Sequence, residues 1–347
     1  MALRLRRHDP AARARYEDLK QLALTQRRAL AGAPGTLKHR TQGGRRYWVR
    51  EYIRVDGRKA DEYLGAESAL PAARVTALRH ELELARALAA GSSALRLFGY
   101  QRIDRKPAAV LAALFNRGLF AAGLTLVGSH AYGVLLNELG VSAAGYRTQD
   151  IDVARSRPLK IALPEDAPFH AVLEESGLRL APVPGLSTRQ PATSFKLPGA
   201  EGLAVDLLIP GREAGKVLAA PELHAFAQAI PWLDFLVEEP LEAIVLSPNQ
   251  VIPVKVPAPE RMALHKLYAS QARRTLRDKA RKDIDQAVVL AAALEQDTPG
   301  RLTDTFKELP RAARPAVARG ALAASRQLGE PHAHARDALL WLAKKTA

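Results

Sequence analysis

The sequence contains no cysteine and no long apolar run, and both absences narrow the possible classes of protein. Without cysteine, disulfide bonds, zinc sites with thiolate ligands and cysteine nucleophiles are excluded. No apolar stretch approaches the roughly 20 residues of a membrane-spanning helix, so we expect no association by a membrane span. The first twenty residues are charged throughout and lack the apolar segment of a secretory signal. A reducing, cytoplasmic setting fits these features.

The charge balance is strongly basic. The 347 residues include 51 Lys and Arg against 36 Asp and Glu, a formal net charge of +15. Such an excess favours a polyanionic partner such as nucleic acid, although a coding bias toward Arg and Ala with a solvated basic surface is the alternative. The length predicts about two domains, and a 48% hydrophobic content is ample for a packed core.

Two carboxylates stand one residue apart in the middle of the chain. If the segment around Asp150 and Asp152 is a strand, both side chains point to one face and Ile151 points to the core. Their Cα atoms are then about 7 Å apart, a spacing at which two carboxylates bind one hard cation.

A phosphate-binding turn precedes this pair. The apolar run Leu124–Val127 ends in Gly128-Ser129, and helical patterning follows over residues 131–139. Backbone N–H groups at the start of a helix suit a phosphate. A phosphate site beside paired carboxylates indicates metal-assisted phosphoryl or nucleotidyl transfer.

A third carboxylate lies further along the chain. We predict two strands, over residues 193–197 and 203–209, and the second is apolar except for Asp206. A lone buried carboxylate is costly, so Asp206 should be paired or bind a metal. A hairpin that brings it beside Asp150 and Asp152 makes a three-carboxylate site; a surface aspartate placed there by chance is the alternative.

The remaining elements are predicted from periodicity and turn signals. We expect helices over 1–31, 71–90, 104–123 and 169–177, strands over 46–55, 58–64, 236–237, 241–246 and 251–256, and helices from 257 to the end. An apolar segment over 159–163 follows the paired carboxylates. The hairpin around 46–64 interleaves arginines with aromatic residues, which indicates either a nucleic-acid surface or a sheet that packs one aromatic face on the body. The domain boundaries predicted from this pattern are 1–103, 104–256 and 257–347.

Four basic residues recur at helical spacing after residue 259: Lys266, Arg273, Arg277 and Arg281. If the helix is unbroken they share one face. Such a stripe is usually a solvated face, but beside a carboxylate pair it can hold triphosphate oxygens.

The combination of Gly128-Ser129, Asp150-x-Asp152 and a later Asp206 resembles the polymerase β-like nucleotidyltransferase superfamily. The resemblance covers about residues 105–295. It implies an α+β fold: a core of mixed sheet and helices, extended here by the N-terminal helix and hairpin and by a C-terminal helical bundle. It also implies that the three aspartates hold two Mg²⁺ ions and that Gly128 and Ser129 bind the NTP phosphates.

The segment 259–287 is similar to the helical part of stand-alone bacterial nucleotidyltransferases and of toxins of the abortive-infection type. In these proteins a helix lysine, matched by Lys266, contacts the phosphates, and a downstream Lys-x-x-Asp is matched loosely by residues 279–283. Arg273 and Arg277 are further candidates for phosphate binding. One departure is the separation of Ser129 from Asp150 by twenty residues, which is longer than in minimal members of the superfamily.

The activity implied is transfer of an NMP from an NTP, ATP included, to an acceptor hydroxyl with release of pyrophosphate. Charge favours RNA, such as tRNA, as the acceptor; a protein or a small molecule is the alternative. Asp206 is expected nearest the acceptor. A nucleic-acid-binding module without catalysis and a metal-dependent phosphohydrolase or nuclease are competing hypotheses. His130 follows the turn and either touches phosphate or has a structural role, and His265 is taken as structural. Neither the oligomeric state nor a cognate antitoxin follows from the sequence.

Overall fold

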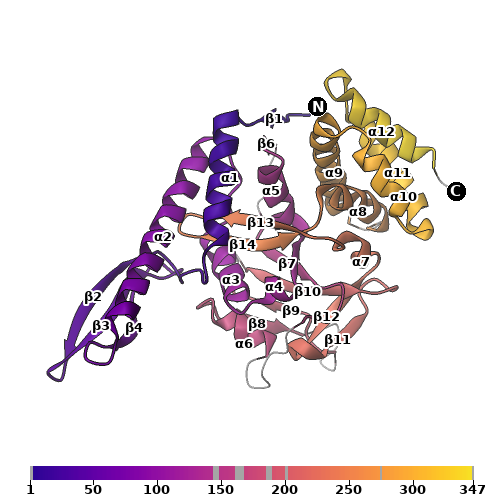
Figure 1. The fold of residues 1–347 in the computed structure, drawn as a ribbon. Coiled ribbons are helices and arrows are strands. Elements are labelled where there is room, and N and C mark those ends of the chain that lie inside the picture. The colour runs from indigo at the N-terminus through magenta and orange to yellow at the C-terminus, as the bar shows by residue number, and fades with distance from the viewer. Residues whose placement is uncertain are drawn as a thin grey trace.

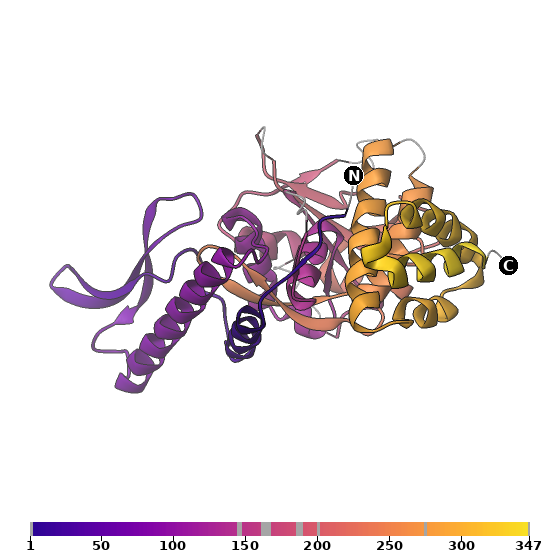
Figure 2. The ribbon, with the colours of Figure 1, turned by 90° about the horizontal axis from the view of Figure 1, so that it is seen from above.

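The computed structural model describes residues 3–143, 148–160, 168–184, 190–199, 202–273 and 276–345. A small sheet and a long helix project from one end of the molecule, a larger sheet with its helices forms the middle, and a helical bundle forms the other end (Figures 1 and 2). This arrangement confirms the predicted α+β class. The boundaries at 103/104 and 256/257 stay predictions.

The projecting end contains fewer helical residues and two more strands than expected. Its elements are β1 (Arg6–Arg7), α1 (Pro10–Leu24), β2 (Thr36–Gln42), β3 (Arg45–Ile53), β4 (Lys59–Ala66) and α2 (Ala72–Leu97). The first helix is shorter than the predicted 1–31 because Asp9 caps it, accepting a hydrogen bond from the Ala11 N–H at 2.8 Å, and Pro10 occupies its first turn. The expected hairpin is the β3–β4 pair, and β2, which was not predicted, adds to it as a third antiparallel strand.

The arginines of this three-stranded sheet are engaged with carboxylates. Arg50 is almost completely buried and lies 2.6 Å from Glu62, and the exposed strands carry similar pairs: Lys38–Glu51, Arg40–Asp61, Arg46–Glu67 and Arg54–Asp56. The rings of Trp48 and His39 are in contact, tilted by 42° with their centroids 3.8 Å apart. The positive charge of the sheet is therefore largely compensated on the sheet itself.

The middle of the molecule is a seven-stranded mixed sheet. Its path runs β11–β12–β10–β7–β5, and β8 and β9 pair off it. The strands are β5 (Thr125–Val127), β7 (Asp150–Ala154), β8 (Ala181–Val183), β9 (Ser194–Lys196), β10 (Ala204–Pro210), β11 (Val217–Ala220) and β12 (Ala225–Ile230). Strands β11 and β12 were not predicted. Most of the apolar segment at 159–163 lies outside the described residues. The strand predicted at 236–237 is wrong, because Leu236 is the last residue of a short helix, Leu233–Leu236.

The helices of this part are α3 (Arg105–Asn116), α4 (Leu119–Ala122), α5 (Gly128–Glu138), α6 (Phe169–Glu174) and α7 (Leu233–Leu236). The helix predicted over 104–123 is broken at Gly118, which has a positive φ of 71°. Strand β6 (Val141–Ser142) pairs with β1. The predicted strands β13 (Leu241–Leu246) and β14 (Val251–Val256) form a separate antiparallel pair.

The C-terminal bundle contains α8 (Pro259–Ala272), α9 (Arg277–Asp297), α10 (Arg301–Glu308), α11 (Arg314–Ser325) and α12 (Ala333–Ala343). The chain leaves helical geometry at Arg273 and Leu276, between α8 and α9, so the unbroken helix needed for a single basic face is not formed. Within the described residues no helix is both long and apolar enough to cross a membrane.

Candidate active site

Two neighbouring strands bring the three predicted aspartates together. Strands β7 and β10 are parallel, with Asp152 opposite Asp206 and Asp150 opposite Ala204. Because side chains alternate along a strand, Asp150 and Asp152 lie on one face, and the register places Asp206 on that same face. The predicted hairpin is the antiparallel β9–β10 pair. Asp206 lies on β10, the second strand of this hairpin, and β10 pairs directly with β7.

The environment of Asp152 and Asp206 disfavours the ionised form of their carboxyl groups. The alternating residues Ile151, Val153 and Val205 are completely buried. Burial raises the pKa of Asp152 to about 6, and the neighbouring charge of Asp206 adds to this rise. Burial also raises the pKa of Asp206, opposed by a hydrogen bond from the Ser194 hydroxyl. The strands therefore concentrate negative charge that a bound cation would stabilise.

The Gly-Ser turn lies directly over Asp152. Val127, the last residue of β5, is opposite Asp152 in the antiparallel β5–β7 pair, and α5 begins at the next residue. Gly128 has a positive φ of 68°, and a Cβ added to it would lie 1.9 Å from Asp152 Oδ2. Both the backbone conformation and the close approach therefore require glycine. The free N–H groups at the start of α5, with Ser129, face the carboxylate region and favour an anion such as a phosphate.

The helical bundle supplies cations to the same region. Lys266 on α8 is buried, and its Nζ lies 2.7 Å from Asp283 Oδ1 on α9. Arg273 donates to the other oxygen of Asp283 at 2.6 Å. The charges of Lys266 and Arg273 act on Asp152, whose raised pKa they partly offset. Arg277 is exposed at the start of α9 and forms no ion pair with the described residues.

Two lysines that were not among the predicted site residues also face the carboxylates. Lys279 lowers the pKa of Asp206 through its charge. Burial and the charge of Lys266 lower the pKa of Lys282, while Asp152 and Asp150 act in the opposite direction. The signal that could have identified them was the Lys-x-x-Asp match at 279–283, since residues three apart lie on one side of a helix.

The donor set fits a hard divalent cation. All three candidate ligands are carboxylates, the oxygen donors that Mg²⁺ prefers, and their mutual repulsion raises the pKa of Asp152. In the described parts of the chain, no three His, Asp or Glu side chains already converge on one point as a finished metal site. The structure thus places the ligands on one face without fixing a coordination geometry.

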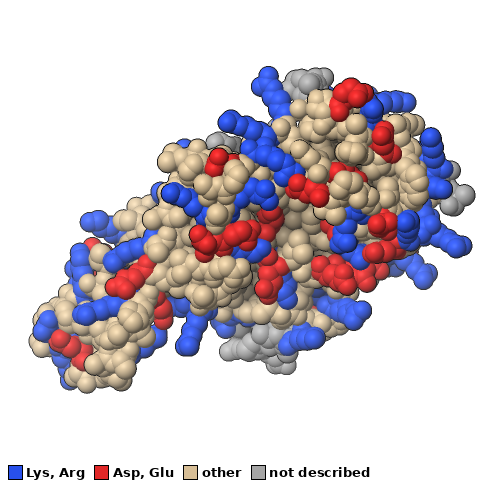
Figure 3. Space-filling model, turned by 45° about the horizontal axis from the view of Figure 1, so that its top comes forward, with Lys and Arg blue, Asp and Glu red and all other residues tan. Residues whose placement is uncertain are grey.

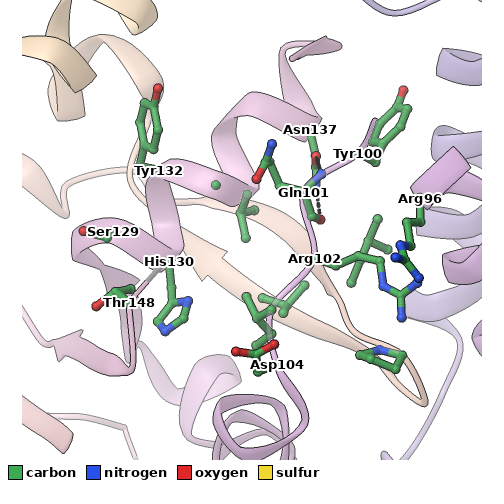
Figure 4. A pocket seen from close by; sticks show the side chains of 16 residues that line it. Arg96, Tyr100, Gln101, Arg102, Asp104, Ser129, His130, Tyr132, Asn137 and Thr148 are labelled. Carbon is green, nitrogen blue, oxygen red and sulfur yellow. Dashed lines mark hydrogen bonds between the residues drawn. The ribbon is translucent and has the colours of Figure 1, made fainter. Parts of the chain in front are cut away.

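A pocket of about 500 Å³ opens beside the turn, and we call it the α5 pocket (Figure 4). Its lining includes Arg96, Arg102, Asp104, Ser129, His130 and Asn137. Asn137 fixes one wall because it exchanges two hydrogen bonds with the backbone of Gln101, at 2.8 and 2.9 Å. Val245 and Leu246 of β13 also line it. No local pattern in the sequence predicts Arg96 or Arg102 as part of such a pocket.

Lysine and arginine side chains are spread along the face shown in Figure 3, with acidic groups between them.

Comparison with known proteins assigns the middle of the chain. A family model described as nucleotidyltransferase matches residues 105–310, more than half of the chain. No curated protein and no solved structure matches.

Proposed function

The chain belongs to the nucleotidyltransferase family, and from this we propose a specific reaction: metal-dependent transfer of an NMP from an NTP to a hydroxyl of RNA. The observation that carries the proposal is the alignment of Asp206 with Asp152 beneath the Gly128 turn. It joins an acidic face to a phosphate-binding helix start, which is the equipment that nucleotidyl transfer needs. The excess of positive charge supports a nucleic acid as acceptor.

Asp150, Asp152 and Asp206 would hold the divalent cation. When bound, it supplies positive charge that stabilises the phosphate oxygens and the attacking oxygen. Ser129 and the first N–H groups of α5 hold the β- and γ-phosphates, and Lys266 offsets charge that develops during transfer. Lys279 and Lys282 add to the positive field over the same face.

The strand order gives the reaction a direction. Strand β7 lies between β10 and β5, so Asp206 lies on one side of Asp152 and the Gly128 turn on the other. The acceptor hydroxyl approaches from the Asp206 side, its oxygen bonds to the α-phosphorus, and its proton passes to the Asp206 carboxylate. The bond between the α-phosphorus and the bridging oxygen breaks, and pyrophosphate leaves on the Ser129 side with that electron pair.

The test is incubation of the full chain and Mg²⁺ with each α-³²P-labelled NTP, total RNA and total protein. We expect label on RNA and at least a hundredfold loss in Asp152→Asn, which keeps the side-chain shape but removes the charge. Asp18→Asn, an exposed aspartate on α1, is the matched control and should keep full activity. Label on protein, or full activity of Asp152→Asn with an unchanged unfolding transition, would contradict the proposal. The similarity to toxin-type members stays a prediction.

A further inference from the structure

The far end of the α5 pocket carries two arginines without an acidic partner. Arg96, in the last turn of α2, and Arg102, in the segment that follows it, place their guanidinium groups side by side (Figure 4). Arg96 is exposed and Arg102 is partly buried, and neither forms an ion pair with a carboxylate among the described residues. Burial and the charge of Arg96 lower the pKa of Arg102. Two like charges held together in this way are stabilised by an anion that accepts hydrogen bonds from both.

A buried polar group marks the path between the two ends of the pocket. His130 is 6% exposed, and its Nε2 has no hydrogen-bond partner among the described residues. Its ring lies between Thr148 and Asp104 (Figure 4). A buried nitrogen without a partner is rare in proteins, and a ligand oxygen in the pocket would satisfy it. Asp104, the carboxylate of the lining, is exposed and accepts a hydrogen bond from Gln149.

The position of the pocket points to one component of the reaction. Ser129 lines the pocket and also stands at the start of α5, on the opposite side of Asp152 from Asp206. In an in-line displacement the leaving group departs opposite the attacking oxygen. The pocket therefore opens on the leaving-group side.

We propose that the α5 pocket receives the pyrophosphate product and that Arg96 and Arg102 bind it on its way out. The inference rests on the proposed function, since pyrophosphate is the product of NMP transfer. The volume of about 500 Å³ exceeds that of the bare ion, so pyrophosphate enters with part of its hydration shell. A roomy site of this kind draws the anion away from the reacting centre without holding it tightly.

The experiment compares the wild type with the double variant Arg96→Gln/Arg102→Gln. Initial rates of label transfer are measured with inorganic pyrophosphate added as inhibitor, and pyrophosphate binding is measured by calorimetry on the full chain without turnover. We expect the inhibition constant and the dissociation constant for pyrophosphate to rise at least tenfold, while KM for the NTP changes less than twofold. The control Arg319→Gln/Arg326→Gln removes two exposed arginines, one on α11 and one just after its end, and should change neither constant.

Each other outcome is decisive. Equal inhibition and dissociation constants for pyrophosphate in the two double variants would overturn the inference. A raised KM for RNA with unchanged constants for pyrophosphate would also overturn it, because that result would assign the pocket to the acceptor. Absence of label transfer in the wild type would refute the proposed function instead. The calorimetric comparison would still decide whether the two arginines bind pyrophosphate.

Discussion

Replacing Gly128 with alanine tests the contact on which the candidate site depends. The added Cβ would lie 1.9 Å from Asp152 Oδ2, whereas ordinary contacts begin at 3.4 Å, so the carboxylate has to move by about 1.5 Å. A misplacement of about 1 Å at a reacting centre costs on the order of a hundredfold in rate. We therefore expect Gly128→Ala to lose at least a hundredfold in kcat for label transfer.

The same substitution also destabilises the fold for two separable reasons. Alanine at a φ of 68° costs about 1–2 kcal/mol, and the overlap with Asp152 adds about 1–3 kcal/mol. Urea unfolding gives the total as a change in the free energy of unfolding.

Gly118 provides the matched control. It has a φ of 71°, but a Cβ added there meets nothing within 4 Å. Gly118→Ala should therefore show the backbone cost alone and keep its activity. Equal losses of stability and activity in the two variants would refute the close approach of Gly128 to Asp152.

Three further predictions follow from the same contacts. Asp283→Asn leaves the buried Lys266 without its charge partner and should lower the free energy of unfolding by about 3–5 kcal/mol in urea titrations. The control Asp297→Asn, which removes the carboxylate of an exposed ion pair, should change the free energy of unfolding by less than about 1 kcal/mol. Burial lowers the pKa of His130 to about 4, below its unfolded value of 6.5, so the unfolded state binds the extra proton between these values. The contribution of His130 to stability should fall by about 3 kcal/mol from pH 6.5 to 4, while the raised pKa of Asp152 acts in the opposite direction over part of this range. Comparison of the wild type with His130→Leu isolates the His130 part of the pH dependence. Chelation with EDTA should abolish label transfer and Mg²⁺ should restore it; activity that persists in EDTA would exclude a divalent cation.

The alternation of apolar and acidic residues was sufficient to predict the strands of the site. In the segments around Asp152 and Asp206, buried aliphatic residues flank each carboxylate, and this period of two specifies both strand geometry and face. The position of Gly128 between an apolar run and a helical pattern likewise predicted the turn. These signals are local, since each is contained within about ten residues.

The contacts that complete the site are between distant segments, and local patterns do not encode them. Lys266 was predicted as a phosphate ligand, but its partner Asp283 belongs to the next helix, beyond a break that periodicity across 259–297 did not reveal. The α5 pocket combines the end of α2, the start of α5 and strand β13, which lie far apart in the chain. Strands β11 and β12 were missed because their short, alanine-rich runs resemble helix as much as strand.

In the N-terminal part of the chain, the density of basic residues along the sequence is a poor guide to where positive charge is left uncompensated. A basic stretch in the hairpin that contains Arg46 and Arg50 is compensated by carboxylates on adjacent strands. Arg96 and Arg102 are unremarkable in the sequence, yet they lie together without an acidic partner among the described residues. Since an unpaired cation gains most from binding a phosphate, two neighbouring arginines that line one pocket without an acidic partner indicate an anion site better than the local count of arginines does. By this criterion the α5 pocket is a stronger candidate for binding phosphate than the projecting sheet.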